Sequence, residues 1–478
     1  MNIYWLRRDL RLIDNMALNQ SLANDQTLAI YCLDQTLLFG KKSSSNRTQI
    51  LLKSLIELAE KLTELGTKLL VISGKPEAIF YTLQDNNPTI QKLYFNEDYS
   101  PYSATRDDLV KQTLKTKLDI LTYKDQVIFS GTEILKADSK PYTIFTAYKR
   151  KWLEKLQQFA ISDFEPLITQ NNFVSNTKIS KLNLSGLKII NLVEFDASLP
   201  KNKQIALQGG ERESRELLTK FTSSLIDQYS LTRNNLAEIG TSRLSVALKF
   251  GLISIRELVY NCLILAKTGN KESIKSWLNE LIWREFYQMI LSNFPEVTKQ
   301  SFQVKYRKLS WEDNPNYIAA WKEGKTGYPI IDAAMRQLNL TGWIPNRARM
   351  IVAMFLTKDL LCDWKIGEEY FMQKLIDGDI AANNGGWQWS AGTGNDAAPY
   401  FRIFNPLAQA QRFDPEANYI KQFIPELKNL PAKIAISPWL ISPLEEIKYE
   451  FSLEKNYHLP IIEHQLQRKR TLELYKTV

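Results

Sequence analysis

The segment 375–389 mixes acidic, amide, glycine and tryptophan residues in a way that no ordinary core segment requires. Gly385 and Gly386 lack a Cβ, so the backbone there can come close to a flat partner. Trp387 and Trp389 are two residues apart and cannot share one face of a helix. We therefore expect a stacked cofactor on one side of this segment and a stacked base on the other.

A second group of residues follows a helical spacing. On a helix, Glu280, Trp283, Arg284 and Tyr287 lie at positions i, i+3, i+4 and i+7, hence on one face. A carboxylate beside a tryptophan suits a hydrogen bond to a base edge, and an arginine suits a phosphate. A partly exposed face with a Glu280–Arg284 ion pair is the alternative.

Two further segments are candidate ligand sites. Residues 240–245, Gly-Thr-Ser-Arg-Leu-Ser, could cradle an anion at a helix start, although an ordinary N-cap by Thr241 or Ser242 would look the same. Pro345 fits a first helical position, which puts Asn346, Arg349 and Met350 on one face as a polar lid over a ligand. A structural pair between Arg349 and a carboxylate is compatible with that role.

Composition narrows the class of protein. At 478 residues the chain should form two to four domain-sized units, and its net charge of +9 favours nucleic acid over membrane as a partner. A basic surface that binds nothing is the alternative. Only two histidines occur, His458 and His464, so imidazole-based triads or zinc sites are nearly excluded before residue 458.

The cysteines and the apolar runs indicate an intracellular, soluble protein. The three cysteines are far apart in apolar surroundings, which predicts reduced, buried thiols and no metal site. The N-terminus has no secretory signal, and the longest apolar run, Met350–Leu356, is too short to cross a bilayer. We expect a cytoplasmic location.

The pattern of apolar residues predicts an α/β domain followed by helices. Residues 1–130 read as a doubly wound parallel sheet without a G-x-G-x-x-G dinucleotide motif. The expected strands are Ile3–Leu6, Leu28–Leu33, Leu69–Ser73, Leu93–Phe95 and Val127–Phe129. The charged segment Arg7–Asp14 after the first strand could be a solvated turn with ion pairs.

The rest of the chain reads as a connection and then an all-α domain. Residues 131–205 lose periodicity and predict a long interdomain linker, and 206–478 is expected to be helical to its end. The expected helices are Glu211–Leu225, Ser254–Ala266, Ser273–Leu291, Tyr317–Glu323, Pro329–Leu338, Asn346–Leu361 and Glu368–Leu375.

These motifs together resemble the photolyase/cryptochrome family, most of all its class I cyclobutane pyrimidine dimer photolyases. The resemblance covers nearly the whole chain, from Trp5–Asn15 through residues 240–245, Asn279–Phe286, Gly324–Pro329 and Asp377–Trp389 to Tyr400–Pro406. It implies an α/β domain followed by a helical domain that binds FAD. One departure is Pro345, where the bacterial pattern commonly has histidine.

The resemblance also implies roles for individual residues. FAD would be held by Tyr229, Thr241, Ser242, Arg243, Leu244, Ser245, Trp277, Asn346, Arg349, Asp377, Asp379 and Asn383, with an Arg349–Asp377 pair and Asn383 facing the flavin N5. Electrons would reach the flavin through Trp387, Trp364 and Trp311, although separate tryptophans are more often core residues. The damaged DNA would contact Glu280, Trp283, Arg284, Asn346, Arg347, Met350, Trp389, Arg402 and Gln409.

The implied activity is light-dependent repair of cyclobutane dimers, by electron transfer from reduced, anionic FAD to a lesion flipped out of the duplex. The protein would act on DNA as a monomer. A deazaflavin antenna is favoured over a folate, with Asp98, Arg106 and Lys249 as its contacts. The absence of histidines near Pro345 disfavours (6-4) photoproducts as substrate. A cryptochrome-type photosensor without repair activity, or a dark flavin oxidoreductase, are the alternatives.

Overall fold

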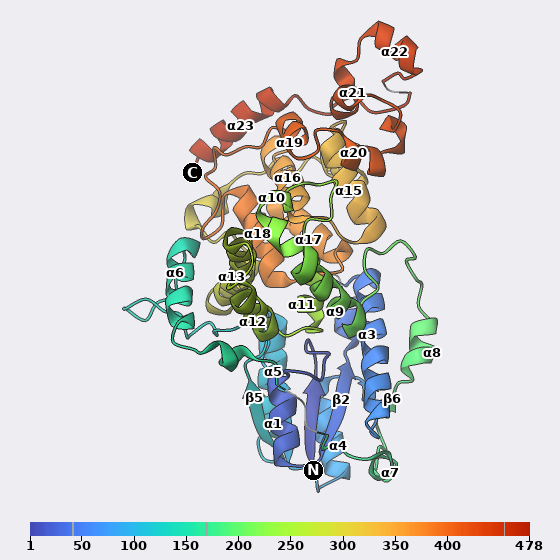
Figure 1. The fold of residues 1–478 in the computed structure, drawn as a ribbon, viewed down its shortest axis with the longest axis vertical. Coiled ribbons are helices and arrows are strands. Elements are labelled where there is room, and N and C mark those ends of the chain that lie inside the picture. The colour runs from blue at the N-terminus through green and yellow to red at the C-terminus, as the bar shows by residue number, and fades with distance from the viewer. Residues whose placement is uncertain (41–42, 168–170, 454) are drawn as a thin grey trace. The chain divides into compact units, whose positions relative to one another are not determined.

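The computed structural model describes residues 1–40, 43–167, 171–453 and 455–478 (Figure 1). Internal contacts divide the chain into two compact units. Unit 1 comprises Met1–Lys201, Leu207–Ser230 and Ser242–Pro295, and unit 2 comprises Asn202–Ala206, Leu231–Thr241 and Glu296–Val478. These units do not follow the expected domain boundaries at 130 and 205, because several helices beyond residue 205 belong to the unit that contains the sheet.

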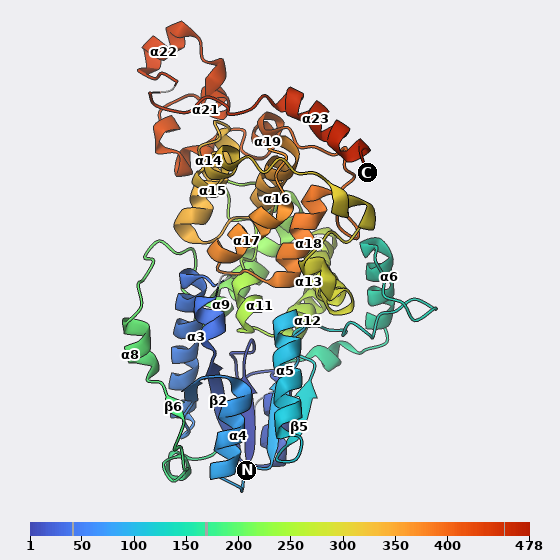
Figure 2. The same cartoon turned by 180° about the vertical axis from the view of Figure 1, so that it is seen from behind.

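The sheet of unit 1 has the strand order β5-β4-β1-β2-β3-β6. Its first five strands in the chain run parallel: β1 (Asn2–Leu6), β2 (Thr27–Leu33), β3 (Leu70–Ser73), β4 (Lys92–Asn96) and β5 (Asp119–Tyr123). Every residue of β1 and β2 is buried, as expected for parallel strands covered on both faces. Helix α1 (Met16–Asn24) lies in front of the sheet in Figure 1, and α4 (Pro76–Asn86) and α5 (Pro101–Leu114) lie on its other face in Figure 2. The predicted α/β class is confirmed.

One predicted strand is wrong, and two strands were not predicted. Residues 127–129 form no strand, and the backbone N–H groups of Ile128 and Phe129 instead donate to the carboxylate of Glu285, at 2.6 and 3.0 Å. The fifth parallel strand is β5, a partly exposed strand at the sheet edge whose polar residues conceal it in the apolar pattern. The short β6 (Lys188–Ile189) pairs antiparallel with β3.

The segment predicted as a linker, 131–205, contains regular structure. It forms α6 (Phe145–Leu156), α7 (Asn176–Ile179), β6 and α8 (Leu192–Ala197), all within unit 1. Helix α6 packs against α13 (Lys271–Asn293) through buried aromatic residues.

The predicted helices are confirmed to within a few residues, with two exceptions. They correspond to α9 (Glu211–Lys220), α12 (Ile255–Leu265) and α13 in unit 1, and to α14 (Pro315–Glu323), α15 (Pro329–Thr341), α16 (Asn346–Met354) and α17 (Trp364–Lys374) in unit 2. The exceptions are Glu211–Leu225, where α9 gives way to a π-helical turn at Phe221–Leu225, and Asn346–Leu361, where α16 gives way to one at Phe355–Asp359. Unit 2 packs around a hydrophobic cluster that includes Trp321, Trp364 and Trp387.

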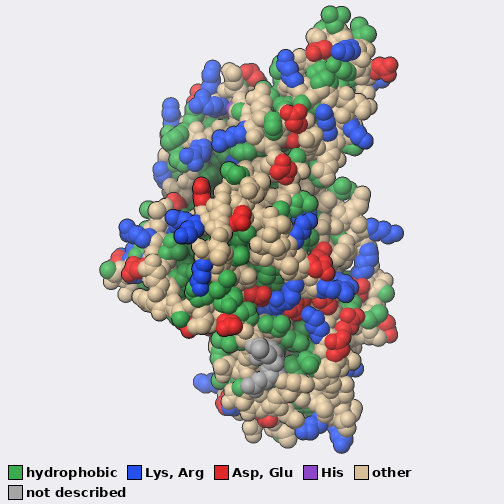
Figure 3. Space-filling view, in the orientation of Figure 1, with side chains coloured by type: hydrophobic (Ala, Val, Ile, Leu, Met, Phe, Trp, Pro, Cys, Tyr) green, Lys and Arg blue, Asp and Glu red, His purple; other side chains and the backbone are tan. Residues whose placement is uncertain are grey.

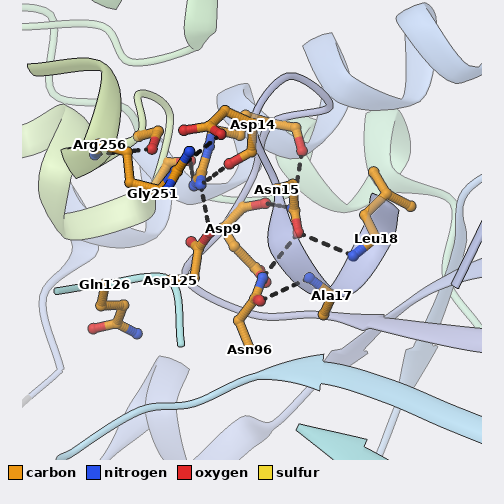
Figure 4. Close-up of polar contacts among 12 residues, drawn as sticks. Asp9, Asp14, Asn15, Ala17, Leu18, Asn96, Asp125, Gln126, Gly251 and Arg256 are labelled. Atoms are coloured by element: carbon orange, nitrogen blue, oxygen red, sulfur yellow. Dashed lines mark hydrogen bonds and ion pairs between the residues drawn. The ribbon is translucent and has the colours of Figure 1, made fainter. Parts of the chain in front are cut away.

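The charged segment after β1 is not a solvated turn; its charged side chains form a buried network in unit 1 (Figure 4). Arg11, which is 1% exposed, donates to Asp125 Oδ1 at 2.6 Å, to the Asp14 carbonyl at 2.7 Å and to the Gly251 carbonyl at 3.1 Å. Arg256 lies 3.3 Å from Asp14 Oδ1. A buried charge requires such partners, so this network fixes the loop that follows β1.

No helix among the described residues is long and apolar enough to cross a membrane. Cys32, Cys262 and Cys362 are buried and free, as predicted from their apolar surroundings.

We expect Arg11→Met to destabilise the protein by about 3–5 kcal/mol, because it leaves the buried carboxylate of Asp125 without its partner. The double variant Arg11→Met/Asp125→Leu removes both charges and should recover part of this loss. Urea unfolding measures both. The control is Lys140→Ala, whose exposed pair with Asp138 should contribute less than about 1 kcal/mol. Equal losses in the single and double variants would contradict the prediction.

Candidate functional site

Helix α13, which is 23 residues long, carries several candidate residues of unit 1. Asn270 caps the start of this helix by accepting from the N–H groups of Glu272 and Ser273. Trp277 is buried against Phe221, with ring centroids 4.8 Å apart, whereas Glu280 and Trp283 are half-buried and share one face. The helix therefore presents one tryptophan to the core and a second tryptophan, beside a carboxylate, partly to the surface.

Arg284 holds the loop that follows β5. Its Nη1 donates to the Gln126 carbonyl at 2.6 Å. At least part of its hydrogen-bonding capacity is thus used inside unit 1, which the prediction of a phosphate contact did not anticipate.

Glu285, next to it, is a buried carboxylate with four donors. Its oxygens accept from the N–H groups of Ile128 and Phe129, from Trp152 Nε1 at 2.6 Å and from the Tyr148 hydroxyl at 3.3 Å. Burial raises the pKa of Glu285 to about 7, while the N–H donors and Arg284 act in the opposite direction. The sequence analysis did not single out this residue.

The segment 240–245 does not form an ordinary N-cap. Helix α11 (Ser245–Phe250) begins after Leu244, whose side chain cannot cap, and Ser242 Oγ accepts from the nearby Leu244 N–H at 3.4 Å. The N-cap alternative for Thr241 or Ser242 is therefore wrong. Arg243 has a positive φ of 54°, and burial lowers the pKa of its guanidinium. Tyr229, also in unit 1, packs edge-on against Phe221.

In unit 2, Arg349 and Asp377 form the predicted ion pair. Arg349 Nη2 donates to Asp377 Oδ2 at 2.7 Å, and Arg349 Nε donates to the Ile344 carbonyl at 2.9 Å. Asp377 is 5% exposed, and its other oxygen, Oδ1, is buried without a hydrogen-bond partner among the described residues. A buried acceptor needs a donor, and the ring N–H of a flavin is one that fits.

The segment 375–389 that opened the sequence analysis ends in helix α18 (Ile380–Ala391). Asp379 caps this helix by accepting from the N–H groups of Ala381 and Ala382. The half-buried Asn383 donates to the Glu368 carbonyl at 2.9 Å. A Cβ added at Gly386 would meet nothing within 4 Å, so the backbone is open on that side, as a flat partner would require.

The two tryptophans of α18 have different surroundings. Trp387 is 2% exposed and lies edge-on to Phe371 and Trp321, with ring centroids 5.0 and 6.0 Å away. Trp389 is half-buried. The two tryptophans thus differ in burial, and which neighbours Trp389 serves stays a prediction.

The other predicted electron donors lie in or beside the same core. Trp364 is buried in the hydrophobic cluster that contains Trp387, and Trp311 packs against that cluster and lies edge-on to Tyr475 at 6.3 Å. Sequence reasoning missed Trp321, the tryptophan in ring contact with Trp387. A lone tryptophan in a helix carries no sequence signal that would tell a contact with Trp387 from ordinary core packing.

The predicted DNA contacts of unit 2 are Trp389 on α18 and further residues on α16, on α19 (Pro406–Phe413) and on the segment before α19. Asn346 is exposed at the start of α16, directly after Pro345 at the cap position, and its amide lies 3.8 Å from the sulfur of Met350. Arg402 is exposed, and Gln409 Oε1 is buried without a partner among the described residues.

Arg347 is held in place by a residue that sequence reasoning missed. Asn234 Oδ1 accepts from Arg347 Nε and Nη2, at 3.1 and 2.9 Å, and the guanidinium lies 4.3 Å from the centre of the Phe413 ring. Burial lowers the pKa of Arg347, and so do the charges of Arg233 and Arg412. Several cations thus gather in one part of unit 2.

Two of the three predicted antenna residues, Asp98 and Lys249, contact the same arginine of unit 1, Lys249 through its backbone carbonyl. Arg8 lies 3.6 Å from Asp98 and donates to the Lys249 carbonyl at 3.0 Å. The guanidinium of Arg106 lies over the Trp5 ring at 4.8 Å. Burial alone would raise the pKa of Asp98, but the nearby arginines outweigh it and lower that pKa to about 2.

On the face shown in Figure 3, charge alone does not outline a binding surface. In Figure 3, Lys and Arg side chains are dispersed over the visible face among acidic and hydrophobic side chains. In the part of the chain that the structure describes, no group of three or more His, Cys, Asp or Glu residues could hold a metal.

The comparisons with known proteins cover almost the whole chain. A family model described as "DNA photolyase" matches residues 2–167, and one described as "FAD binding domain of DNA photolyase" matches 277–477. A protein of a Synechococcus species, named deoxyribodipyrimidine photo-lyase, is 37% identical over 99% of this chain and 96% of its own.

Solved structures agree with these matches. A bacterial class III photolyase from Agrobacterium tumefaciens superposes with a TM-score of 0.91 at 30% identity, covering 100% of this chain and 97% of that one. A cryptochrome from a Synechocystis species superposes with a TM-score of 0.88 at 26% identity, covering 99% of each chain.

The raised pKa of Glu285 predicts a specific pH dependence of stability. The pKa of this carboxyl is about 7 in the folded protein and 4.5 ordinarily. Its contribution to the free energy of unfolding is therefore fully present below pH 4.5 and is lost as the pH rises from 4.5 to 7. Compared with Glu285→Gln, the wild type should lose about 3 kcal/mol of unfolding free energy over this window. Urea unfolding of both proteins across the window measures the difference, and a constant difference would contradict the assignment.

Gly367 should be required for the packing of Trp387. A Cβ at position 367 would lie 2.0 Å from Trp387 Cη2, so Gly367→Ala forces the ring to move and should cost about 1–3 kcal/mol. Gly386→Ala, a helical glycine with open space around it, is the matched control and should not destabilise the unliganded protein. Thermal unfolding of the two variants compares them, and equal midpoints would refute the assignment.

Proposed function

The chain belongs to the DNA photolyase family, and on this premise we propose that it repairs cyclobutane pyrimidine dimers in DNA under blue or near-ultraviolet light with bound FAD. The full-length relationship to proteins named deoxyribodipyrimidine photo-lyase supports this activity. When bound and reduced, FAD supplies an electron that splits the cyclobutane bonds and takes it back afterwards. We place the chain with the class I dimer photolyases.

The observation that carries the cofactor assignment is the buried carboxylate of Asp377, which pairs with the half-buried Arg349 and has one oxygen without a partner among the described residues. Arg349 holds one carboxylate oxygen of Asp377, which leaves the other directed to a donor outside the described protein groups. Asp377 would accept from the flavin ring, and the amide of Asn383 would lie near it without readily giving up a proton. The remaining residues proposed to hold FAD are Tyr229, Thr241, Ser242, Arg243, Leu244, Ser245, Trp277, Asn346 and Asp379.

The lesion would be recognised by stacking and by hydrogen bonds. Glu280 would bind a base edge, while Trp283 and Trp389, both half-buried, offer ring surface to pyrimidines. Gln409 has a buried oxygen that a donor on the lesion or its strand would satisfy. The other proposed contacts to lesion or strand are Arg284, Asn346, Arg347, Met350 and Arg402.

The electron path, the antenna, the oligomeric state and the location of the protein are proposed in addition to the repair activity. Trp387, Trp364 and Trp311 would pass electrons to the flavin; the burial of the first two in one core supports this. Arg8 contacts both Asp98 and the backbone of Lys249, and this proximity supports an antenna site there, with a deazaflavin favoured over a folate. We propose that the protein acts as a monomer in the cytoplasm and associates with the nucleoid when it binds DNA.

The second candidate is a cryptochrome-type photosensor, which the similarity to the Synechocystis cryptochrome favours. Such a protein would bind FAD but would need no lesion-binding residues. A dark flavin oxidoreductase would consume NAD(P)H without light. Dimer repair separates the first two functions, and NAD(P)H consumption identifies the third.

Repair is tested by reducing the purified protein, adding an oligonucleotide with one cyclobutane dimer and illuminating with blue light. We expect light-dependent recovery of thymine absorbance, and its absence with a fully reduced flavin would overturn the proposal. Glu280→Ala should keep its FAD spectrum and repair about tenfold or more slowly, because a charged hydrogen bond is lost. Glu272→Ala, an exposed glutamate on the same helix, is the control and should repair normally.

A further inference from the structure

The ring of Trp283 is stacked on a phenylalanine from the segment that the sequence suggested was a linker. Phe145, the first residue of α6, lies parallel to it, with ring centroids 3.6 Å apart and an interplanar angle of 8°. No water molecule fits between rings this close. One face of Trp283 is therefore covered, although the residue as a whole is only half-buried.

The neighbours of Trp283 hold this arrangement from several sides. Phe286 meets Trp283 edge-on at 5.7 Å and also meets Phe145 edge-on at 5.7 Å, while Tyr287 lies tilted at 5.5 Å. These contacts all come from α13 and α6. The plane of the Trp283 ring is therefore set by its stacking on Phe145 rather than by its own helix alone.

Phe145 itself is anchored through the rest of α6. Tyr148 and Trp152, about one and two turns further along that helix, both donate to the buried carboxylate of Glu285 on α13. Phe145 is 7% exposed, so it has little room to move away from Trp283. The same two helices thus fix both partners of the stack.

We propose that Phe145 is a positioning residue for lesion recognition, which holds Trp283 in the plane in which a damaged pyrimidine stacks on it. The inference rests on the proposed function, because it takes Trp283 as a lesion contact. A flipped pyrimidine would then extend a stack of two rings to three. Since Phe145 orders the tryptophan before DNA arrives, less conformational freedom is lost on binding.

The test is the dissociation constant in the dark for a dimer-containing oligonucleotide and for the same undamaged duplex. Phe145→Leu should weaken binding to the dimer by about three- to tenfold and leave binding to undamaged DNA unchanged. Phe145→Tyr, which keeps a stacking ring, should bind the dimer as the wild type does. Repair at saturating DNA should be unaffected in both variants, because Phe145 does not touch the reacting atoms.

Phe129→Leu is the matched control for lost packing. Phe129 packs edge-on against Trp152 in the second half of α6, with ring centroids 5.5 Å apart. Its substitution therefore disturbs the same helix without removing the stack on Trp283. A loss of dimer binding as large as that of Phe145→Leu would mean that only the position of α6 matters, and the inference would fail.

A double variant separates this inference from the proposed function. If Trp283→Ala binds the dimer like the wild type, then Trp283 is no lesion contact, and both that part of the proposed function and the inference fall. If Trp283→Ala binds weakly, Phe145→Leu should add no further loss in that background, and an additive loss would overturn the role of Phe145 alone. Should Phe145→Leu fail to fold, Phe145→Met takes its place in the same comparison.

Discussion

A buried carboxylate in the middle of α13 sets the arrangement of the functional part of unit 1. Taking Glu285 out of water is costly unless its oxygens accept hydrogen bonds, and its four donors come from the loop 127–129 and from α6. These segments must therefore meet α13 at one point. The face of α13 that carries Glu280 and Trp283 is consequently bounded by α6, which puts Phe145 against Trp283.

In unit 2 the polar residues of α18 divide between structure and chemistry. Asn384 and Gln388 both donate to the Val297 carbonyl. These two amides therefore hold α18 in place. Trp387 fills the core where Gly367 leaves room for its ring. The unpartnered oxygen of Asp377 remains as a binding group, and it precedes the helix rather than lying within it.

Much of the fold could be predicted because it depends on local patterns. Apolar runs located the first four strands, and apolar periodicity with Pro, Gly and Asn at the ends located seven helices. The errors share one physical reason. Residues 127–129 are apolar, but their backbone N–H groups bind the Glu285 side chain and do not pair with a strand. The segment Arg7–Asp14 is charged, but its charges are buried because partners distant in the sequence satisfy them.

The sequence by itself determined the family, the residue types available for stacking and for anion binding, and the Arg349–Asp377 pair as an expectation, because ordered motifs and helical spacing are local properties. Only the tertiary structure decided which of these groups are engaged by other parts of the protein and which are left to bind a ligand. Arg284 is drawn to a backbone carbonyl, Trp321 meets Trp387, Asn234 holds Arg347 and Phe145 covers one face of Trp283. Each of these contacts joins residues remote in the chain, and their pairing follows from the burial of polar and aromatic groups that no local pattern records.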